Sequence, residues 1–229
     1  MKLGERLTAI ADLVPRGSRV ADIGTDHAYL PVYLITNGIA SQAVAGDVHK
    51  GPYEAARDTI SRSGLSERID LRLGDGIRIL RPGEVDTVVI AGMGGATIID
   101  ILSAEPEIVK ALSRLILQPM QAAASLRRWL FANGWRVVGE ELVEEDGRLY
   151  EVMALERGRE NTEDAVLLDI GPLLWRERHP LLKQHISNLI AQHKRVVAEM
   201  AGSAQASGAP KYREYQQKIA ELEEKYACL

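Results

Sequence analysis

The chain has 229 residues, of which 46% are hydrophobic and 26% charged, and its formal net charge is −4. This size allows one large domain, or one α/β domain with a small appendage. Its single cysteine, Cys228, excludes an intramolecular disulfide and a cysteine-rich metal site. No apolar run reaches membrane-spanning length and the first residues lack the apolar core of a signal peptide, so we expect a cytoplasmic protein with no membrane partner.

Strand-like and helix-like segments alternate along the first 134 residues. An amphipathic N-terminal helix presents apolar residues at helical spacing: Leu3, Leu7, Ile10, Leu13 and Val14. Strands are expected after it at 19–23, 42–47, 68–73, 85–91 and 112–118. Helices are expected between and after them at 28–38, 52–63, 95–104 and 122–134. This alternation predicts an α/β fold in which helices cover both faces of a parallel sheet.

Two further strand-like runs, 135–143 and 148–155, follow without room for a crossover helix. The Asp146-Gly147 pair between them is a hairpin turn signal. A sheet that ends in an antiparallel hairpin is typical of the Rossmann-like fold of class I methyltransferases, whereas a typical dinucleotide dehydrogenase ends in another crossover. The pattern therefore favours the methyltransferase architecture for residues 1–160.

Residues 161–229 have a different pattern, which predicts a separate helical appendage. Apolar residues recur at helical spacing from Leu173 to Val197, a turn-rich connector spans 201–210, and a second helix is expected over 211–227. These features predict an antiparallel, coiled-coil-like helical hairpin. Residues 172–229 contain 9 Lys and Arg against 6 Asp and Glu, a net charge of +3, which leaves −7 for the rest of the chain.

The first strand leads into the most informative loop of the chain, where the sequence reads Asp22-Ile-Gly-Thr-Asp-His-Ala-Tyr29. Only Gly24 matches the dinucleotide fingerprint, because Asp26 and Tyr29 stand at its second and third glycine positions. A pyrophosphate cradle is therefore disfavoured. A sulfonium cofactor such as S-adenosylmethionine needs close backbone approach and hydrogen-bond acceptors, which Gly24 and Asp22 can supply. The alternative for Asp22 is a helix cap or a turn cap.

Candidate cofactor-binding residues also follow three later strands. Asp47 ends the second strand, where an acidic residue typically accepts hydrogen bonds from ribose hydroxyls. Gly74 and Asp75 follow the third strand, where the carboxylate can reach an adenine amino group, although an ordinary turn explains them equally well. The fourth strand ends in small and flexible residues that permit close approach by a flat ring, or that serve only tight packing: Gly92, Met93 and Gly94.

Several chemistries lack the residues that they need. The Asn- or Asp-Pro-Pro-aromatic element that grips an exocyclic amino group is absent after the fourth strand, and no cysteine is placed for covalent C5 methylation of pyrimidines. The sequence contains no zinc-protease or P-loop motif, and its scattered histidines predict no metal site. The residues by themselves thus favour a methyltransferase with a sulfonium cofactor, leave the acceptor open, and make no prediction of oligomeric state.

The combination of these motifs resembles the bacterial TrmK family along the whole chain. The resemblance rests on Asp22 to Pro31, Gly46-Asp47 with Gly51-Pro52, Gly74-Asp75-Gly76 and Ile90 to Gly95. Members of that family methylate N1 of adenine 22 in tRNA. The resemblance therefore implies S-adenosylmethionine as the methyl donor and tRNA as the substrate.

Methylation of adenine N1 fits the residues of the first loop. The N1 lone pair attacks without an obligatory base, but the methylated ring is cationic, so a nearby carboxylate stabilises it. Asp26 is the first candidate for that role, His27 is its orienting partner, and Tyr29 stacks on the adenine. The alternatives are that Asp26 and His27 only shape the cofactor loop and that Tyr29 is a packing residue.

The basic helical hairpin is expected to hold tRNA through phosphate contacts, with Lys183, Lys194 and Arg195 on its first helix. Its alternative is a solvated coiled coil that serves stability or dimerisation. Three other functions stay open at this point: a nicotinamide-dependent oxidoreductase, a non-catalytic RNA-binding module, and a methyltransferase with another acceptor. Labelled methyl transfer and cofactor titration distinguish them.

Overall fold

The computed structural model describes residues 2–160, 164–202 and 209–229. The chain divides into two compact units, residues 1–161 and 162–229. Within the described ranges, no helix combines the length and the apolar character needed to cross a membrane.

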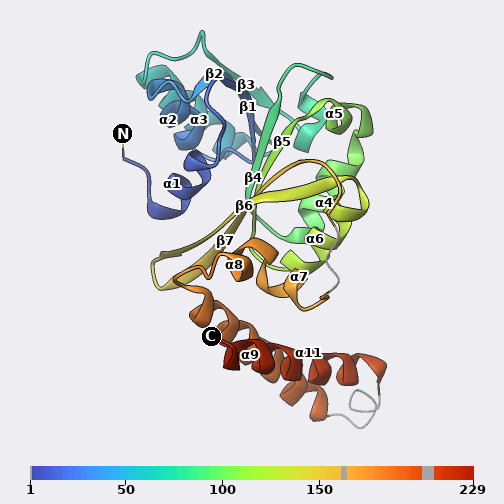
Figure 1. Ribbon diagram of the computed structural model, residues 1–229. Helices are drawn as coiled ribbons and strands as arrows, with labels where there is room; N and C mark the ends of the chain where they lie inside the picture. The colour runs from blue at the N-terminus through green and yellow to red at the C-terminus, as the bar shows by residue number, and fades with distance from the viewer. Residues whose placement is uncertain (1, 161–163, 203–208) are drawn as a thin grey trace. The chain divides into compact units, whose positions relative to one another are not determined.

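A seven-stranded sheet forms the centre of the first unit, in the order β3-β2-β1-β4-β5-β7-β6 (Figure 1). Strands β1 to β5 pair in parallel, and β7 joins β5 and β6 in antiparallel fashion. The strands are β1 (Ser18–Ile23), β2 (Ala40–Asp47), β3 (Ile69–Leu73), β4 (Thr87–Met93), β5 (Arg114–Pro119), β6 (Trp135–Glu145) and β7 (Arg148–Arg157). The predicted α/β sheet with a terminal antiparallel hairpin is confirmed.

Helices cover both faces of this sheet (Figure 1). On one face lie α1 (Glu5–Asp12), α2 (Tyr29–Thr36) and α3 (Lys50–Arg62). On the other lie α4 (Gly95–Ala104), α5 (Pro106–Ala111) and α6 (Ala123–Ala132). Neither α5 nor the short 3₁₀ helix η1 (Gly76–Ile79) is predicted from the sequence, because each is too short to show a helical period.

The apolar runs of the central strands explain why the sheet is buried on both faces. Val88, Val89 and Ile90 on β4 are all fully buried, as are Leu115 and Ile116 on β5. Parallel strands that are covered on both sides read as continuous apolar segments, which is the pattern that predicted them. The edge hairpin instead turns at Asp146 and Gly147, both with positive φ (52° and 70°), as its turn signal predicted.

The second unit contains two short helices, α7 (Leu167–Ile170) and α8 (Pro172–Arg176), and two long ones, α9 (Leu182–Ala201) and α11 (Pro210–Ala227). The long helices lie side by side and antiparallel (Figure 1). His193 on α9 meets Tyr215 on α11 with ring centroids 5.4 Å apart, and Leu222 of α11 is fully buried. The predicted helical hairpin is confirmed for the described residues; most of its expected connector, 203–208, lies outside them.

The first long helix begins later than its apolar spacing suggested. The chain breaks between α8 and α9, and Arg178 adopts a left-handed conformation with φ of 54°. Pro180 explains the break, because proline lacks an N–H donor and disfavours helical geometry at the preceding His179.

Candidate active site

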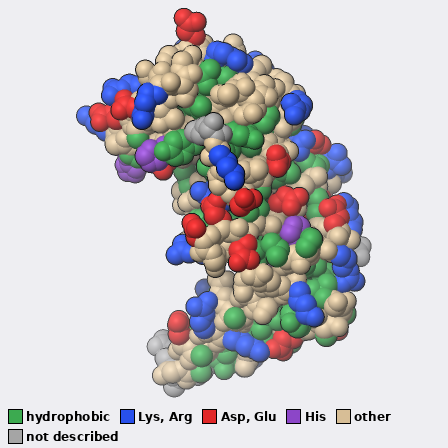
Figure 2. All heavy atoms as spheres, turned by 90° about the vertical axis from the view of Figure 1, so that its left-hand side faces the viewer, with side chains coloured by type: hydrophobic (Ala, Val, Ile, Leu, Met, Phe, Trp, Pro, Cys, Tyr) green, Lys and Arg blue, Asp and Glu red, His purple; other side chains and the backbone are tan. Residues whose placement is uncertain are grey.

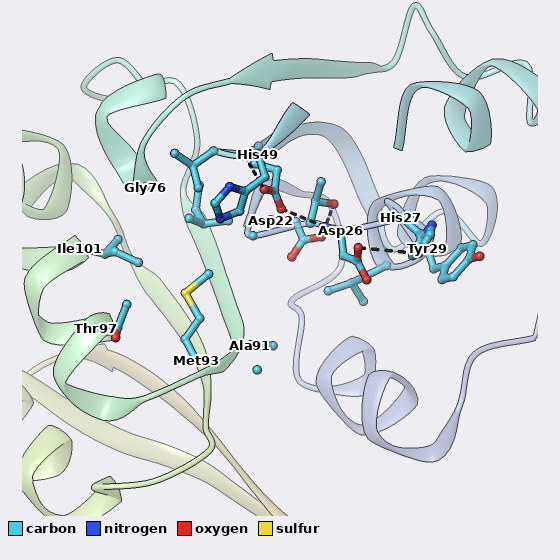
Figure 3. Close-up of a pocket in the computed structure, with 18 of the residues that line it drawn as sticks. Asp22, Asp26, His27, Tyr29, His49, Gly76, Ala91, Met93, Thr97 and Ile101 are labelled. Carbon is cyan, nitrogen blue, oxygen red and sulfur yellow. Dashed lines mark hydrogen bonds and ion pairs between the residues drawn. The ribbon is translucent and has the colours of Figure 1, made fainter. Parts of the chain in front are cut away.

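A cavity of about 480 Å³ opens at the carboxyl ends of the parallel strands in the first unit (Figure 3). Ligands of open α/β sheets bind at this edge. The cavity is lined by ten of the eleven residues that the sequence singled out: Asp22, Gly24, Asp26, His27, Tyr29, Asp47, Gly74, Asp75, Gly92 and Met93. The remaining one, Gly94, is not in the lining.

The loop after β1 has a strained backbone on both sides of His27. Asp26 and Ala28 adopt positive φ values of 50° and 56°, which are unfavourable for residues with a Cβ. Such strain gathers at functional sites, where the surrounding structure holds it. Here Gly24 and Thr25 anchor the loop, since their N–H groups donate to the carbonyl oxygen of Gly46 at 2.8 and 3.0 Å.

The strained loop places its functional side chains at the cavity mouth. The rings of His27 and Tyr29 stack with centroids 5.2 Å apart and an interplanar angle of 12°. His27 Nε2 lies 3.7 Å from Asp26 Oδ1. Tyr29 is 43% exposed, so the pair offers a flat aromatic surface beside a solvent-accessible carboxylate.

Asp22 is the most perturbed acid of the cavity. Its carboxylate is buried, and Oδ2 accepts a hydrogen bond of 2.6 Å from the Thr25 hydroxyl. Burial raises the pKa of the Asp22 carboxyl from its ordinary value of 3.8 to about 6, the Thr25 hydrogen bond opposes this shift, and the charge of Asp47 adds to it. A buried carboxylate that is costly to ionise gains most from a cationic ligand.

Asp47 connects the loops after β1 and β2. Its Oδ1 accepts the N–H of His49 at 2.9 Å, and its Oδ2 accepts the N–H of Asp26 at 3.4 Å. Both oxygens keep lone pairs that can accept hydrogen bonds from ligand hydroxyls. Asp75 is exposed by comparison, and its carboxylate is paired with Arg78.

A bulge at Gly92 shapes the end of β4. Pairing with β5 skips this residue between Ala91 and Met93, and its φ is 76°. Met93 then projects into the cavity (Figure 3), and its methyl group would lie 2.3 Å from a Cβ placed on Gly24. Gly24 leaves room for this methyl group and has a φ of 77°, which residues with a Cβ rarely adopt, so the loops after β1 and β4 meet through Met93 and Gly24.

Gly94 and its neighbour Gly95 face the loop after β5 instead. A Cβ on Gly95 would lie 2.6 Å from the carbonyl oxygen of Ala122, and one on Gly94 would lie 3.3 Å from the side chain of Gln121. The Gly95 N–H donates to the Gln121 carbonyl oxygen at 2.9 Å. Close packing between two loops therefore explains the small residues here, and a role of Gly94 in cofactor binding stays a prediction.

The cavity also contains residues that the sequence analysis missed. His49 and the exposed Val48 come from the start of the segment after β2, Thr97 and Ile101 from α4, and Arg6 from α1. Helical spacing predicts that Thr97 and Ile101 share a face with each other, but no local signal places Arg6 at the carboxyl edge of the sheet.

S-Adenosylmethionine fits this donor and acceptor set. Asp22 suits its cationic amino acid part, Asp47 its ribose hydroxyls, and Val48 and Ile101 supply apolar contact for a flat ring. The loop has no second or third glycine with which to wrap a pyrophosphate, which disfavours a nicotinamide dinucleotide.

Comparison with known proteins agrees with this geometry. Residues 3–153 match a family model described as a methyltransferase domain. The chain is 38% identical to the tRNA (adenine(22)-N(1))-methyltransferase of Bacillus subtilis over 100% of its own length and 96% of the relative. The crystal structure of the B. subtilis m1A22 tRNA methyltransferase TrmK superposes with a TM-score of 0.81 at 34% identity, covering 99% of this chain and 96% of that one.

A Streptococcus pneumoniae protein solved in complex with S-adenosyl-L-methionine is 31% identical, with a TM-score of 0.87 and coverage of 98% of this chain and 100% of that one. The similarity extends through both units, and the cavity lies within the segment that matches the methyltransferase domain. The chain therefore belongs to the family of bacterial tRNA (adenine(22)-N(1))-methyltransferases.

Proposed function

We propose that this protein transfers the methyl group of S-adenosylmethionine to N1 of adenine 22 in tRNA. The observation that carries the proposal is the cavity itself, in which buried Asp22 and Asp47 lie beside an exposed Asp26, His27 and Tyr29. Whole-length similarity to the B. subtilis enzyme supports the same acceptor. Because tRNA is the substrate, we place the protein in the cytoplasm.

The two buried acids hold the cofactor on this proposal. Asp22 pairs with its ammonium group and Asp47 accepts hydrogen bonds from its ribose hydroxyls, while Gly24 and Gly92 permit close backbone approach. When bound, S-adenosylmethionine supplies an electrophilic methyl group on a cationic sulfur. The carbonyl oxygen of Gly46 fixes the loop after β1, so the acids are in place before the ligand arrives.

The exposed residues of the loop act on the adenine. N1 lies on the Watson–Crick edge, so the base must be unpaired and extruded before it enters the cavity. Tyr29, backed by the His27 ring, provides a stacking surface for the extruded base. Asp26 favours the positive charge that develops on the ring as N1 is methylated, and His27 orients that carboxylate.

The helical unit supplies affinity for the tRNA backbone on this proposal. Lys183, Lys194 and Arg195 are exposed on α9. Lys194 pairs with Glu223 at 2.6 Å and Lys183 lies 5.2 Å from the centre of the Tyr226 ring, so Arg195 is the least engaged of the three. Figure 2 shows one face on which basic side chains are interspersed with acidic and apolar ones, which suits separate phosphate contacts better than a continuous basic patch.

Methyl transfer to unmodified bacterial tRNA, followed by nucleoside analysis, tests the reaction. N1-methyladenosine at position 22 is the expected product. Cofactor binding without that product would indicate another acceptor, and tight NADH binding without S-adenosylmethionine binding would indicate an oxidoreductase. An Asp26→Asn variant should lower kcat at least about tenfold while cofactor affinity stays unchanged; an unchanged kcat would assign Asp26 to loop shape alone.

Salt dependence of tRNA binding tests the helical unit. Arg195→Ala should weaken tRNA binding and reduce the salt slope by about 1, with cofactor affinity unchanged. Gln184→Ala, a neutral exposed substitution on the same helix, is the matched control. Equal tRNA affinity and equal slopes in both variants would contradict the role of Arg195.

A further inference from the structure

A polar cluster at the edge of the cavity contains an arginine, Arg6, that has no part in the reaction as proposed. Its five members come from α1 and from the ends of β4 to β7: Arg6, Gly92, Gln118, Glu145 and Tyr150. Arg6 is the member that lines the cavity together with the Gly92 bulge. We call these five residues the Arg6 cluster.

Gln118 holds Arg6 and the Gly92 bulge through one atom. Its side chain is buried, and its Oε1 accepts hydrogen bonds from Arg6 Nη1 at 3.0 Å and from the Gly92 N–H at 3.1 Å. Its Nε2 donates to the Pro119 carbonyl oxygen at 3.2 Å, which fixes the orientation of the amide. These hydrogen bonds therefore fix the guanidinium of Arg6 beside the Gly92 bulge.

Glu145 and Tyr150 hold the same side chain from the edge hairpin. Glu145 Oε1 accepts the backbone N–H of Arg6 at 3.3 Å, and its Oε2 lies 3.7 Å from Arg6 Nε. The guanidinium carbon lies 5.5 Å from the centre of the Tyr150 ring. A Cβ on Gly4 would lie 2.2 Å from Glu145 Oε1, so glycine at the start of α1 is what lets this carboxylate approach.

This arrangement leaves one arm of the guanidinium available to a ligand. The side chain of Arg6 is 26% exposed, and within the described part of the chain its Nη2 has no hydrogen-bond partner. An arginine that serves only to tie α1 to the sheet has no need of a solvent-accessible arm at a cavity. The N–H groups of Nη2 can donate charge-assisted hydrogen bonds to the oxygens of a carboxylate or a phosphate.

The charges of the cavity favour the same assignment. It holds four carboxylates: Asp22 and Asp47 lie at the carboxyl ends of β1 and β2, and Asp26 and Asp75 lie in the loops after β1 and β3. Arg6 is the only Lys or Arg among the described residues of the lining. Four acids suit cationic and hydroxyl groups, but they repel the anionic oxygens that an amino acid moiety and a nucleotide both carry.

We propose that Arg6 is the anion-binding residue of this cavity, and that its guanidinium receives the oxygens of a ligand carboxylate or phosphate. The inference rests on the proposed function, which supplies two sources of such oxygens. One is the carboxylate of the cofactor's amino acid part, and the other is a phosphate of the nucleotide that enters the cavity.

Binding of two cofactor analogues separates these sources. S-Adenosylhomocysteine and 5′-methylthioadenosine are both uncharged at sulfur, but only the first carries the amino acid carboxylate. Calorimetry with wild type, Arg6→Gln and Arg6→Lys should be compared with Arg16→Gln, which removes an exposed charge outside the cavity lining. The KM for tRNA is measured for the same proteins.

If the anion is the carboxylate, Arg6→Gln should weaken the binding of S-adenosylhomocysteine about ten- to a hundredfold. The affinity for 5′-methylthioadenosine should stay within about twofold of that of wild type. If the anion is a phosphate, both analogues should bind as to wild type, while the KM for tRNA rises at least about tenfold. In either case Arg6→Lys should recover part of the loss, because it restores the charge without the planar fork.

Three outcomes would overturn the inference. Arg6→Gln could leave the affinities for both analogues and the KM for tRNA unchanged. It could also weaken the binding of both analogues equally, which would indicate a change of cavity shape. Glu145→Gln could reproduce the losses of Arg6→Gln, which would make the cluster an anchor for α1. Wild type that binds neither analogue would overturn the proposed function as well, whereas wild-type binding with an unaffected Arg6→Gln variant would overturn this inference alone.

Discussion

The buried Asp22 carboxylate should make the ligand-free protein less stable at neutral pH than it would be without that charge. Burial raises the pKa of this carboxyl from 3.8 to about 6. Since one unit corresponds to about 1.4 kcal/mol, ionised Asp22 destabilises the folded state by up to about 3 kcal/mol above pH 6. The folded state binds the proton more tightly than the unfolded one, so this loss of stability shrinks as the pH falls from 6 toward 3.8.

An Asp22→Asn variant isolates this effect. The asparagine removes the charge and keeps an oxygen that accepts the Thr25 hydroxyl. At pH 8 the ligand-free variant should be more stable to denaturant than wild type by up to about 3 kcal/mol, and at pH 5 by about half as much. Asp58→Asn, an exposed substitution on α3, should change stability by less than about 0.5 kcal/mol.

The cofactor should narrow this difference in stability. At a concentration of 100 Kd, S-adenosylmethionine stabilises wild type by about 2.7 kcal/mol. The variant should lose at least about tenfold in affinity, because the ammonium group of the cofactor loses its ionised partner. An Asp22→Asn protein that is no more stable than wild type at pH 8, or that binds the cofactor equally well, would refute the reasoning from burial.

Three further substitutions probe the frame around the cavity. Asp47→Asn should weaken S-adenosylmethionine binding about tenfold in calorimetry, because an amide accepts hydroxyl donors less strongly than a carboxylate; unchanged affinity would remove it from the ribose site. Gly95→Ala should lower stability by about 1 to 3 kcal/mol in denaturant melts, because its Cβ meets the Ala122 carbonyl, whereas Gly51→Ala on α3, with no neighbour within 4 Å, should be neutral or stabilising. Arg127→Met should cost about 3 to 5 kcal/mol, because it leaves the two glutamates that this buried arginine bridges without a counter-charge; a smaller loss would mean that they take up protons instead.

Local patterns of the sequence determined most of the architecture. Continuous apolar runs predicted β1 and β4 as strands buried on both faces, and Asp146-Gly147 predicted the edge hairpin. Ten candidate residues could be placed at one cavity because the carboxyl ends of parallel strands converge at one edge of the sheet. The order of strands and loops, which the sequence shows, is enough to place them there.

Tertiary structure alone decided which side chains complete the site. Arg6 and Gln118 are 112 residues apart and meet because α1 packs across the sheet, a contact without a local period or motif. The direction of Gly94 depends on how the loop after β5 approaches it, and the raised pKa of Asp22 depends on what buries it. The spacing of residues along the chain determines the helices and strands and where they end. The pKa of a carboxylate and the orientation of a guanidinium depend instead on contacts and burial, which come from segments that folding brings together.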